Sequence, residues 1–289
     1  MSRDNRAVKD PHQKAIVELF RAFDGSKNRR KIFEDFVILT AISISNRVDF
    51  THAAEREKQW LQVAGQYKQQ EIDIFSEMAA QIVMGLEQNP DQDFLGEMYM
   101  NLDFGSSTAG QFFTPYNVCR MLAAINFRWQ ALLEQICDNG FVSAADPASG
   151  AGALLVAFAN ECKLKGINYQ EKVLFVAQDL DYIVGLMCYI ALSYLGCAGY
   201  VVIGDSLQEP LKSYDGRALL PVDNGRIWFT PMFFSSLWTG RRLAAKLDLD
   251  LLYGEKTVKP ERLTIKACEE KKKTETLQVI TGTGQMSLF

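Results

Sequence analysis

The chain has 289 residues, of which 48% are hydrophobic and 23% charged, which is typical of one medium-sized soluble domain with a helical appendage. Its net charge of −4 argues against a protein that coats duplex DNA unaided, because non-specific binding depends on many Lys and Arg contacts with phosphate. A local basic face remains open. No signal peptide precedes the polar start, and the longest apolar stretch, residues 183–195, is too short to span a bilayer, so we expect a cytoplasmic protein.

From residue 12 to about residue 102, apolar residues recur at helical spacing. We predict a long polar-rich helix from about Ala53 to Glu87, closed by Asn89-Pro90. Residues 1–104 are therefore expected to form an N-terminal helical region. The basic run at 27–31 has two interpretations, a phosphate contact or an ordinary solvated helix start.

From about residue 105 to residue 252 the chain alternates strands and helices. Candidate strands are 141–145, 173–177 and 200–203, with helices at 151–165 and 183–195 between them and a last helix at 236–252. Repeats at this spacing imply an α/β fold with a parallel, doubly wound sheet and right-handed crossovers. Residues 253–289 alternate charged and polar side chains, which predicts a tail with little fixed structure.

Three aspartates, Asp146, Asp179 and Asp205, each follow one of the predicted strands. Ligands of such sheets bind at the carboxyl ends of the strands, so these side chains are candidates for one binding site. For each aspartate alone, a solvated strand end is the alternative.

The six cysteines contain no Cys-x-x-Cys pair and the chain has two histidines, so we expect no zinc site. Most of the cysteines are expected to be buried thiols in a reducing compartment.

A glycine turn, Asp-Pro-Ala-Ser-Gly-Ala-Gly at 146–152, follows the first strand. A strand, glycine turn and helix bring backbone N–H groups against a nucleotide-like ligand, and Gly150 and Gly152 let the ligand approach without a Cβ in the way. The alternative is that the glycines only tighten the connection. Upstream, Thr114-Pro115 predicts a helix start, with the Thr hydroxyl as cap and Pro at the first helical position.

These segments carry a family resemblance. Ala-Gly-Gln-Phe-Phe-Thr-Pro at 109–115, the turn at 146–152, Gln178-Asp179 and Gly-Asp-Ser-Leu at 204–207 occur in the order seen in adenine-specific DNA methyltransferases. The chain most resembles the modification subunits of type I restriction systems and short N-6 DNA methylase proteins of bacterial mobile elements. The resemblance covers residues 12–240, is specific in 105–207, and implies a fold similar to that of methyltransferases dependent on S-adenosylmethionine (SAM).

The resemblance also implies a cofactor site. The loop Gln111, Phe112, Phe113 and Thr114 would pack on the amino-acid end of SAM. The turn residues Asp146, Pro147, Ser149, Gly150 and Gly152 would also bind the cofactor, with Asp146 holding its ammonium group directly or through water. Asp179 would accept the two ribose hydroxyls and Asp205 the exocyclic amine of the cofactor's adenine. Leu180 and Leu207 would flank that adenine. For the loop, the alternative is a buried aromatic residue and an ordinary cap.

One segment of the family is absent. Adenine methylation also needs a flipped base held by an Asn/Asp-Pro-Pro-Phe/Tyr segment, but none of the eight prolines here are adjacent. The nearest stand-in is Trp-Phe-Thr-Pro-Met-Phe-Phe at 228–234, whose Phe229, Pro231 and Phe233 are the candidates for a catalytic role. We favour a hydrophobic staple onto the sheet. Only about eighty residues follow Leu207, so we expect no target-recognition domain here; sequence choice would need a separate specificity subunit or would not occur.

The last five residues, Gln-Met-Ser-Leu-Phe at 285–289, resemble the peptide by which bacterial DNA enzymes dock on the replication sliding clamp. Gln285, Leu288 and Phe289 would be the anchors, and a frayed tail is the alternative.

Taken together, the sequence predicts a SAM-dependent adenine-specific DNA methyltransferase that acts on DNA with a partner. The other hypotheses are a catalytically silent relative that binds SAM and DNA or a partner protein, and a small-molecule methyltransferase.

Overall fold

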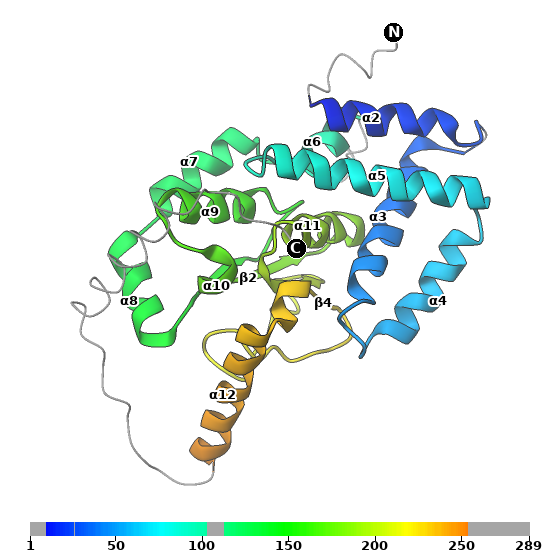
Figure 1. Ribbon diagram of the computed structural model, residues 1–289. Coiled ribbons are helices and arrows are strands. Elements are labelled where there is room, and N and C mark those ends of the chain that lie inside the picture. Colours follow the sequence, from blue (N-terminus) through cyan, green and yellow to red (C-terminus); the bar gives the residue numbers. More distant parts are fainter. Residues whose placement is uncertain (1–9, 26, 103–112, 254–289) are drawn as a thin grey trace.

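The structure is a computed structural model that describes residues 10–25, 27–102 and 113–253 (Figure 1). Its first part is helical, as expected. The elements are α2 (Pro11–Leu19), the 3-10 turn η1 (Phe20–Ala22), α3 (Arg29–Ser45), α4 (Ala53–Ala64), α5 (Gln69–Gln88) and α6 (Phe94–Asn101). Asn28 caps α3 by accepting a hydrogen bond from the N–H of Arg30, which supports the ordinary helix start for this basic run.

The prediction of one helix from Ala53 to Glu87 is wrong, because α4 ends at Ala64 and α5 begins at Gln69. Tertiary contacts of Tyr67 stabilise the corner between the two helices. Its hydroxyl donates a hydrogen bond to Oδ2 of Asp35 at 2.8 Å, and its ring packs edge-on against Phe75, with ring centroids 4.9 Å apart. The Glu71 carboxylate then accepts from the N–H of Lys68 and starts the new helix. Helical periodicity continues through both helices, so the pattern alone did not mark this corner.

The sheet has the order β1 (Val142–Asp146), β2 (Val173–Asp179), β3 (Ala198–Ile203) and β4 (Ile227–Phe229). The first three strands are parallel, and they confirm the three predicted strands with shifts of at most two residues at their ends. Helices α9 (Ala153–Leu164), α10 (Tyr169–Lys172) and α11 (Tyr182–Tyr194) connect them. The antiparallel β4 was not predicted; it lies in the segment whose sequence indicated only a cluster of aromatic residues.

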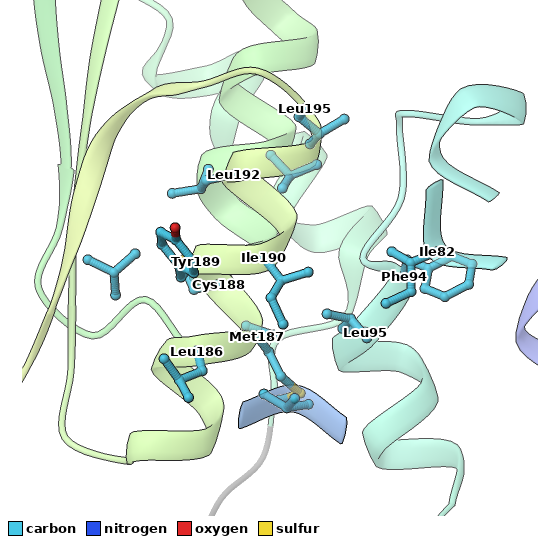
Figure 2. Packing of buried hydrophobic residues seen from close by; sticks show 14 of the residues in the cluster. Ile82, Phe94, Leu95, Leu186, Met187, Cys188, Tyr189, Ile190, Leu192 and Leu195 are labelled. Carbon is cyan, nitrogen blue, oxygen red and sulfur yellow. The ribbon is translucent and has the colours of Figure 1, made fainter. Parts of the chain in front are cut away.

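Two buried clusters cover the two faces of the sheet. On one face, α9 and α11 pack on the strands, and α3 lies alongside α11 (Figure 1). Figure 2 shows side chains of α11, among them Met187 and Ile190, directed toward Leu95 of α6, so the core is continuous from the N-terminal helices to the sheet. On the other face, Trp238 of α12 (Ser236–Tyr253) is buried against Phe141. The predicted α/β class, a sheet covered on both faces and preceded by a helical region, is confirmed.

Four cysteines, Cys119, Cys162, Cys188 and Cys197, are buried free thiols, as predicted for most of the six. Burial raises the pKa of the Cys119 thiol to about 11, which leaves it protonated and unreactive near neutral pH. Within the described residues no group of histidine, cysteine, aspartate or glutamate side chains is arranged to hold a metal ion. Over the same part of the chain, no helix combines the length and apolar character needed to cross a membrane.

Candidate functional site

The three predicted aspartates lie at one edge of the sheet, which we call the aspartate edge (Asp146, Asp179 and Asp205). Asp146 is the last residue of β1, Asp179 is the last residue of β2, and Asp205 follows β3 by two residues. Because β1, β2 and β3 are parallel neighbours in register, their carboxyl ends meet side by side. The sequence prediction that the strand ends bring these carboxylates together is therefore confirmed; their role as a cofactor site stays a prediction.

The glycine turn leans against the end of β2. The N–H of Gly150 donates to Oδ2 of Asp179 at 2.8 Å, and the N–H of Ser149 donates to the backbone oxygen of Gln178 at 3.0 Å. Gly152 has a φ of 93°, and a Cβ there would lie 2.9 Å from the Cys188 sulfur, so its role includes tight packing of the connection. Gly150 has a φ of 56°, and among the described residues a Cβ there would meet only the Phe113 ring, at 3.7 Å, which is compatible with the predicted approach of a ligand.

Asp179 is fixed by the backbone. Its Oδ2 accepts from Gly150, and its Oδ1 accepts from the N–H of Asp181 at 3.0 Å. A carboxylate offers about four acceptor sites, so one remains on each oxygen for a further donor. Burial raises the pKa of the Asp179 carboxyl; the two N–H groups oppose that rise, and the charges of Asp181 and Asp146 add to it. The result is an oriented pair of acceptors.

Asp146 and Asp205 each keep one oxygen unused. Oδ1 of Asp146 accepts from the N–H of Ala148 at 3.1 Å, and Oδ1 of Asp205 accepts from the N–H of Leu207 at 2.8 Å. The second oxygen of each has no hydrogen-bond partner among the residues that the structure describes. Burial raises the pKa of the Asp146 carboxyl because it disfavours the ionised form. A cation bound beside this carboxyl would stabilise the ionised form.

Two leucines stand beside the aspartate edge with their side chains in solvent. Leu180 directly follows β2 and is 71% exposed, and Leu207 follows β3 and is 92% exposed. Exposed leucines are common, but two at the ends of neighbouring strands offer apolar surface next to the carboxylates. Both were predicted to flank an adenine ring, and their positions are compatible with that prediction.

The upstream loop is described only in part, because Gln111 and Phe112 lie outside the described residues. Phe113 stacks on Tyr99 of α6, with ring centroids 5.7 Å apart, and covers Gly150. Tyr99 was not among the predicted site residues, because it lies on a helix of the N-terminal region and belongs to no motif. The expected helix start is wrong by one residue: α7 (Tyr116–Asn126) has Pro115 as its N-cap, with extended backbone, and no side chain caps it.

The candidate catalytic segment lies elsewhere. Phe229 pairs with Tyr200 near the start of β3, and the hydroxyl of Thr230 accepts from the N–H of Gly199 at 3.0 Å. At 3.3 Å per strand residue, this point is roughly 20 Å from Asp205, at the opposite end of the sheet. Phe229, Pro231 and Phe233 therefore do not line the aspartate edge. The alternative of a hydrophobic staple fits: Phe233 is buried and stacks on Phe229 at 4.9 Å.

The protein is of the α/β class, and its carboxylates and glycine turn lie at the carboxyl edge of the sheet, where proteins of this class bind their ligands. A family model described as N-6 DNA methylase matches residues 90–245, just over half of the chain. The chain belongs to the N-6 DNA methylase family, and thus to a family of methyltransferases.

Two further comparisons add little. A search of curated proteins finds no match. Among solved structures, the chain is similar to one described as a class I S-adenosylmethionine-dependent methyltransferase from Listeria monocytogenes, with 16% sequence identity, a TM-score of 0.36, and coverage of 81% of this chain and 80% of that one.

Proposed function

We propose that this protein binds SAM at the aspartate edge and methylates the N6 amine of adenine in DNA, with sequence choice supplied by a partner. Membership of the N-6 DNA methylase family supports this activity. One observation carries the cofactor assignment: Asp179 is held by two backbone N–H groups and keeps an acceptor site on each oxygen. Two adjacent ribose hydroxyls are donors that match this arrangement.

The remaining residues of the edge fit the other parts of SAM. The open oxygen of Asp146 suits the ammonium group, because a charge-assisted hydrogen bond is stronger than a neutral one. The open oxygen of Asp205 suits the exocyclic amine of adenine, with Leu180 and Leu207 on the faces of the ring. Phe113 over Gly150 would form a wall of the pocket. SAM supplies an electrophilic methyl group; the chain would bind and orient it.

Calorimetric titration with SAM tests the first half of the proposal. We expect one site per chain, and we expect Asp146→Ala to lower the affinity about 10- to 100-fold, because hydrogen bonds to charged groups contribute about 1.5–3 kcal/mol. Asp138→Ala, an exposed aspartate on α8 (Trp129–Asn139), is the matched control and should bind as the parent does. No heat with the parent protein would overturn the cofactor assignment.

Methyl transfer is tested separately, with SAM labelled in its methyl group and mixed DNA. Label in adenine that disappears with Asp146→Ala supports the enzyme. A second candidate function is favoured by the position of the 228–234 segment, which lies away from the aspartate edge. This alternative is a catalytically silent relative that binds SAM and DNA, or a partner, as an accessory or regulatory protein. Tight SAM binding without transfer, also in the presence of candidate partners, would support it.

The partners we propose are DNA, a specificity subunit and the replication sliding clamp. The clamp proposal rests on Gln285, Leu288 and Phe289, which lie outside the described residues. Pull-down with purified clamp tests it: deletion of residues 285–289 should abolish capture, and unchanged capture would remove the proposal. Residues 1–104, as the helical region, are proposed to help hold DNA and partners, and the boundaries at 104 and 252 remain part of this proposal.

A further inference from the structure

Gln178, the penultimate residue of β2, is a buried polar side chain with an unusual set of partners. Its side chain is directed to the loop after β3, and the residue is only 4% exposed. The amide nitrogen donates to the backbone oxygens of Gly204 at 3.2 Å and Glu209 at 3.0 Å. The amide oxygen accepts from the N–H of Leu211 at 3.2 Å. Both ends of the amide therefore bind the same loop.

That loop carries two of the proposed cofactor residues, Asp205 and Leu207. Its internal hydrogen bonds, such as Glu209 N–H to the Asp205 oxygen at 2.7 Å, give it a local shape but do not attach it to the sheet. Its other attachments include the N–H of Gly204, which donates to the backbone oxygen of Asp179 at 2.8 Å, an ion pair between Arg226 and Glu209, and the packing of Leu211 against a buried cluster of the sheet. Both side chains of this ion pair are about half exposed, and exposed ion pairs contribute little to stability.

The main chain of the same residue holds the other side of the site. The backbone oxygen of Gln178 accepts from the N–H of Ser149 in the glycine turn. Gln178 thus contacts both the turn, which faces the amino-acid end of SAM in the proposed function, and the loop that faces its adenine, as Asp179 does through Gly150 and Gly204. Gln178 itself lies beneath both and is covered by them.

We propose that Gln178 is a positioning residue that sets the selectivity of the site for adenine over other purines in the cofactor. It acts through Asp205, whose open oxygen would read the exocyclic amine only while the loop is held at the sheet. This inference rests on the proposed function. It differs from it by assigning the selectivity to a side chain that does not touch the ligand.

The test compares two ligands by calorimetry, S-adenosylhomocysteine and S-inosylhomocysteine, which differ in the amine that Asp205 would read. The parent protein should prefer the adenosyl ligand. Gln178→Met keeps the buried volume and removes all three side-chain hydrogen bonds; we expect the adenosyl affinity to fall about tenfold or more, the effect of losing one well-made hydrogen bond. The affinity for the inosyl ligand should change by less than about threefold, because that ligand lacks the amine and loses no contact with Asp205.

Gln178→Glu is a second variant with the same shape, which accepts from Leu211 but cannot donate to the two carbonyl oxygens when ionised. It should lose the preference as Gln178→Met does. Asp205→Ala should lose it too, and adding Gln178→Met to Asp205→Ala should cost no further preference. The matched control is Gln170→Met, whose amide donates to the Leu195 oxygen at 3.2 Å, away from the aspartate edge.

The outcomes separate the two proposals. If the parent protein binds neither ligand, the proposed function fails and this inference fails with it. If the parent binds the adenosyl ligand but both Gln178 variants weaken the two ligands equally, Gln178 is structural only and the inference alone is overturned. The inference is overturned likewise if the variants remain folded by circular dichroism and keep the parent's preference.

Discussion

The two ends of the sheet differ in the polar groups that they leave available to a ligand. At the aspartate edge, backbone N–H groups orient Asp146, Asp179 and Asp205 and still leave acceptor sites open. At the opposite end, the Thr230 hydroxyl donates to the Cys197 oxygen at 2.7 Å, accepts from the N–H of Gly199, and is completely buried. The first end keeps acceptors for the proposed ligand, whereas the Thr230 hydroxyl at the second end is bound to the backbone of the fold.

The aromatic rings follow the same distinction. Phe233 stacks on Phe229, meets Tyr200 edge-on at 5.8 Å, and lies under the guanidinium of Arg242 at 4.1 Å. Its faces are thus occupied by neighbours within the protein, and none is left for a nucleic-acid base. An aromatic-rich segment indicates base stacking only where a ring face stays open, whereas Leu180 and Leu207 are exposed apolar side chains at the aspartate edge.

The largest effect is expected at the glycine turn. Gly152→Ala combines a left-handed φ with a clash on Cys188, so we expect a loss of roughly 3–5 kcal/mol in the free energy of unfolding, the sum of backbone strain and overpacking. Gly166→Ala is the control: its φ is 75°, but a Cβ there meets nothing within 4 Å, so the loss should be about 1 kcal/mol. Urea unfolding measures both. Equal losses would show that the contact with Cys188 is not tight.

Substitutions at the two ends should have opposite effects on binding and stability. Asp179→Asn places an NH₂ group against one of the two N–H donors, so SAM affinity should fall about 100-fold, near 3 kcal/mol.

Thr230→Val keeps the shape of the opposite end and leaves buried backbone groups of Cys197 and Gly199 without their partner. It should cost about 1–3 kcal/mol of stability and leave SAM affinity unchanged. A loss of SAM affinity with Thr230→Val would contradict the separation of the two ends.

The same comparison explains what could be predicted from the sequence. The strands and their terminal aspartates follow from short apolar runs that end in a polar residue, a local signal that parallel geometry then brings to one edge. The corner at 65–68 and the strand β4 depend on contacts with distant residues, such as Tyr67 with Asp35 and Phe229 with Tyr200. The role of Gln178 is a side-chain contact across a loop, which no periodicity reports.

A smaller effect is expected from the aromatic staple. Phe233→Leu shortens a buried ring that packs on Phe229 and Tyr200, so the protein should lose about 1–2 kcal/mol of stability through lost packing. Methyl transfer and SAM affinity, measured at a temperature where the variant stays folded, should equal those of the parent. A variant that folds and binds SAM but has lost transfer would return the segment to the list of catalytic candidates.

The smallest effect near neutral pH, and the one that reports on the aspartate edge most directly, is the pH dependence of SAM binding. Burial raises the pKa of the Asp146 and Asp179 carboxyls, and the ammonium group and the ribose hydroxyls of the ligand would bind their ionised forms. Affinity should therefore be highest near neutral pH, where the ammonium is still charged, and should fall as the pH drops through these raised values, starting above the value of about 3.9 for an ordinary aspartate. Because the ligand lowers both pKa values, binding on the acid side should release protons.

Calorimetry in two buffers of different ionisation enthalpy measures that release. Asp146→Asn removes the titrating group that would bind the ammonium, so it should lower the number of protons released as well as the affinity. Asp138→Asn, on the exposed surface of α8, should change neither. If the affinity of the parent protein stays constant down to the pKa of an ordinary aspartate, then the buried carboxylates do not face the cation. In that case the aspartate edge would be, like the Thr230 end, a group of side chains that serves the fold alone.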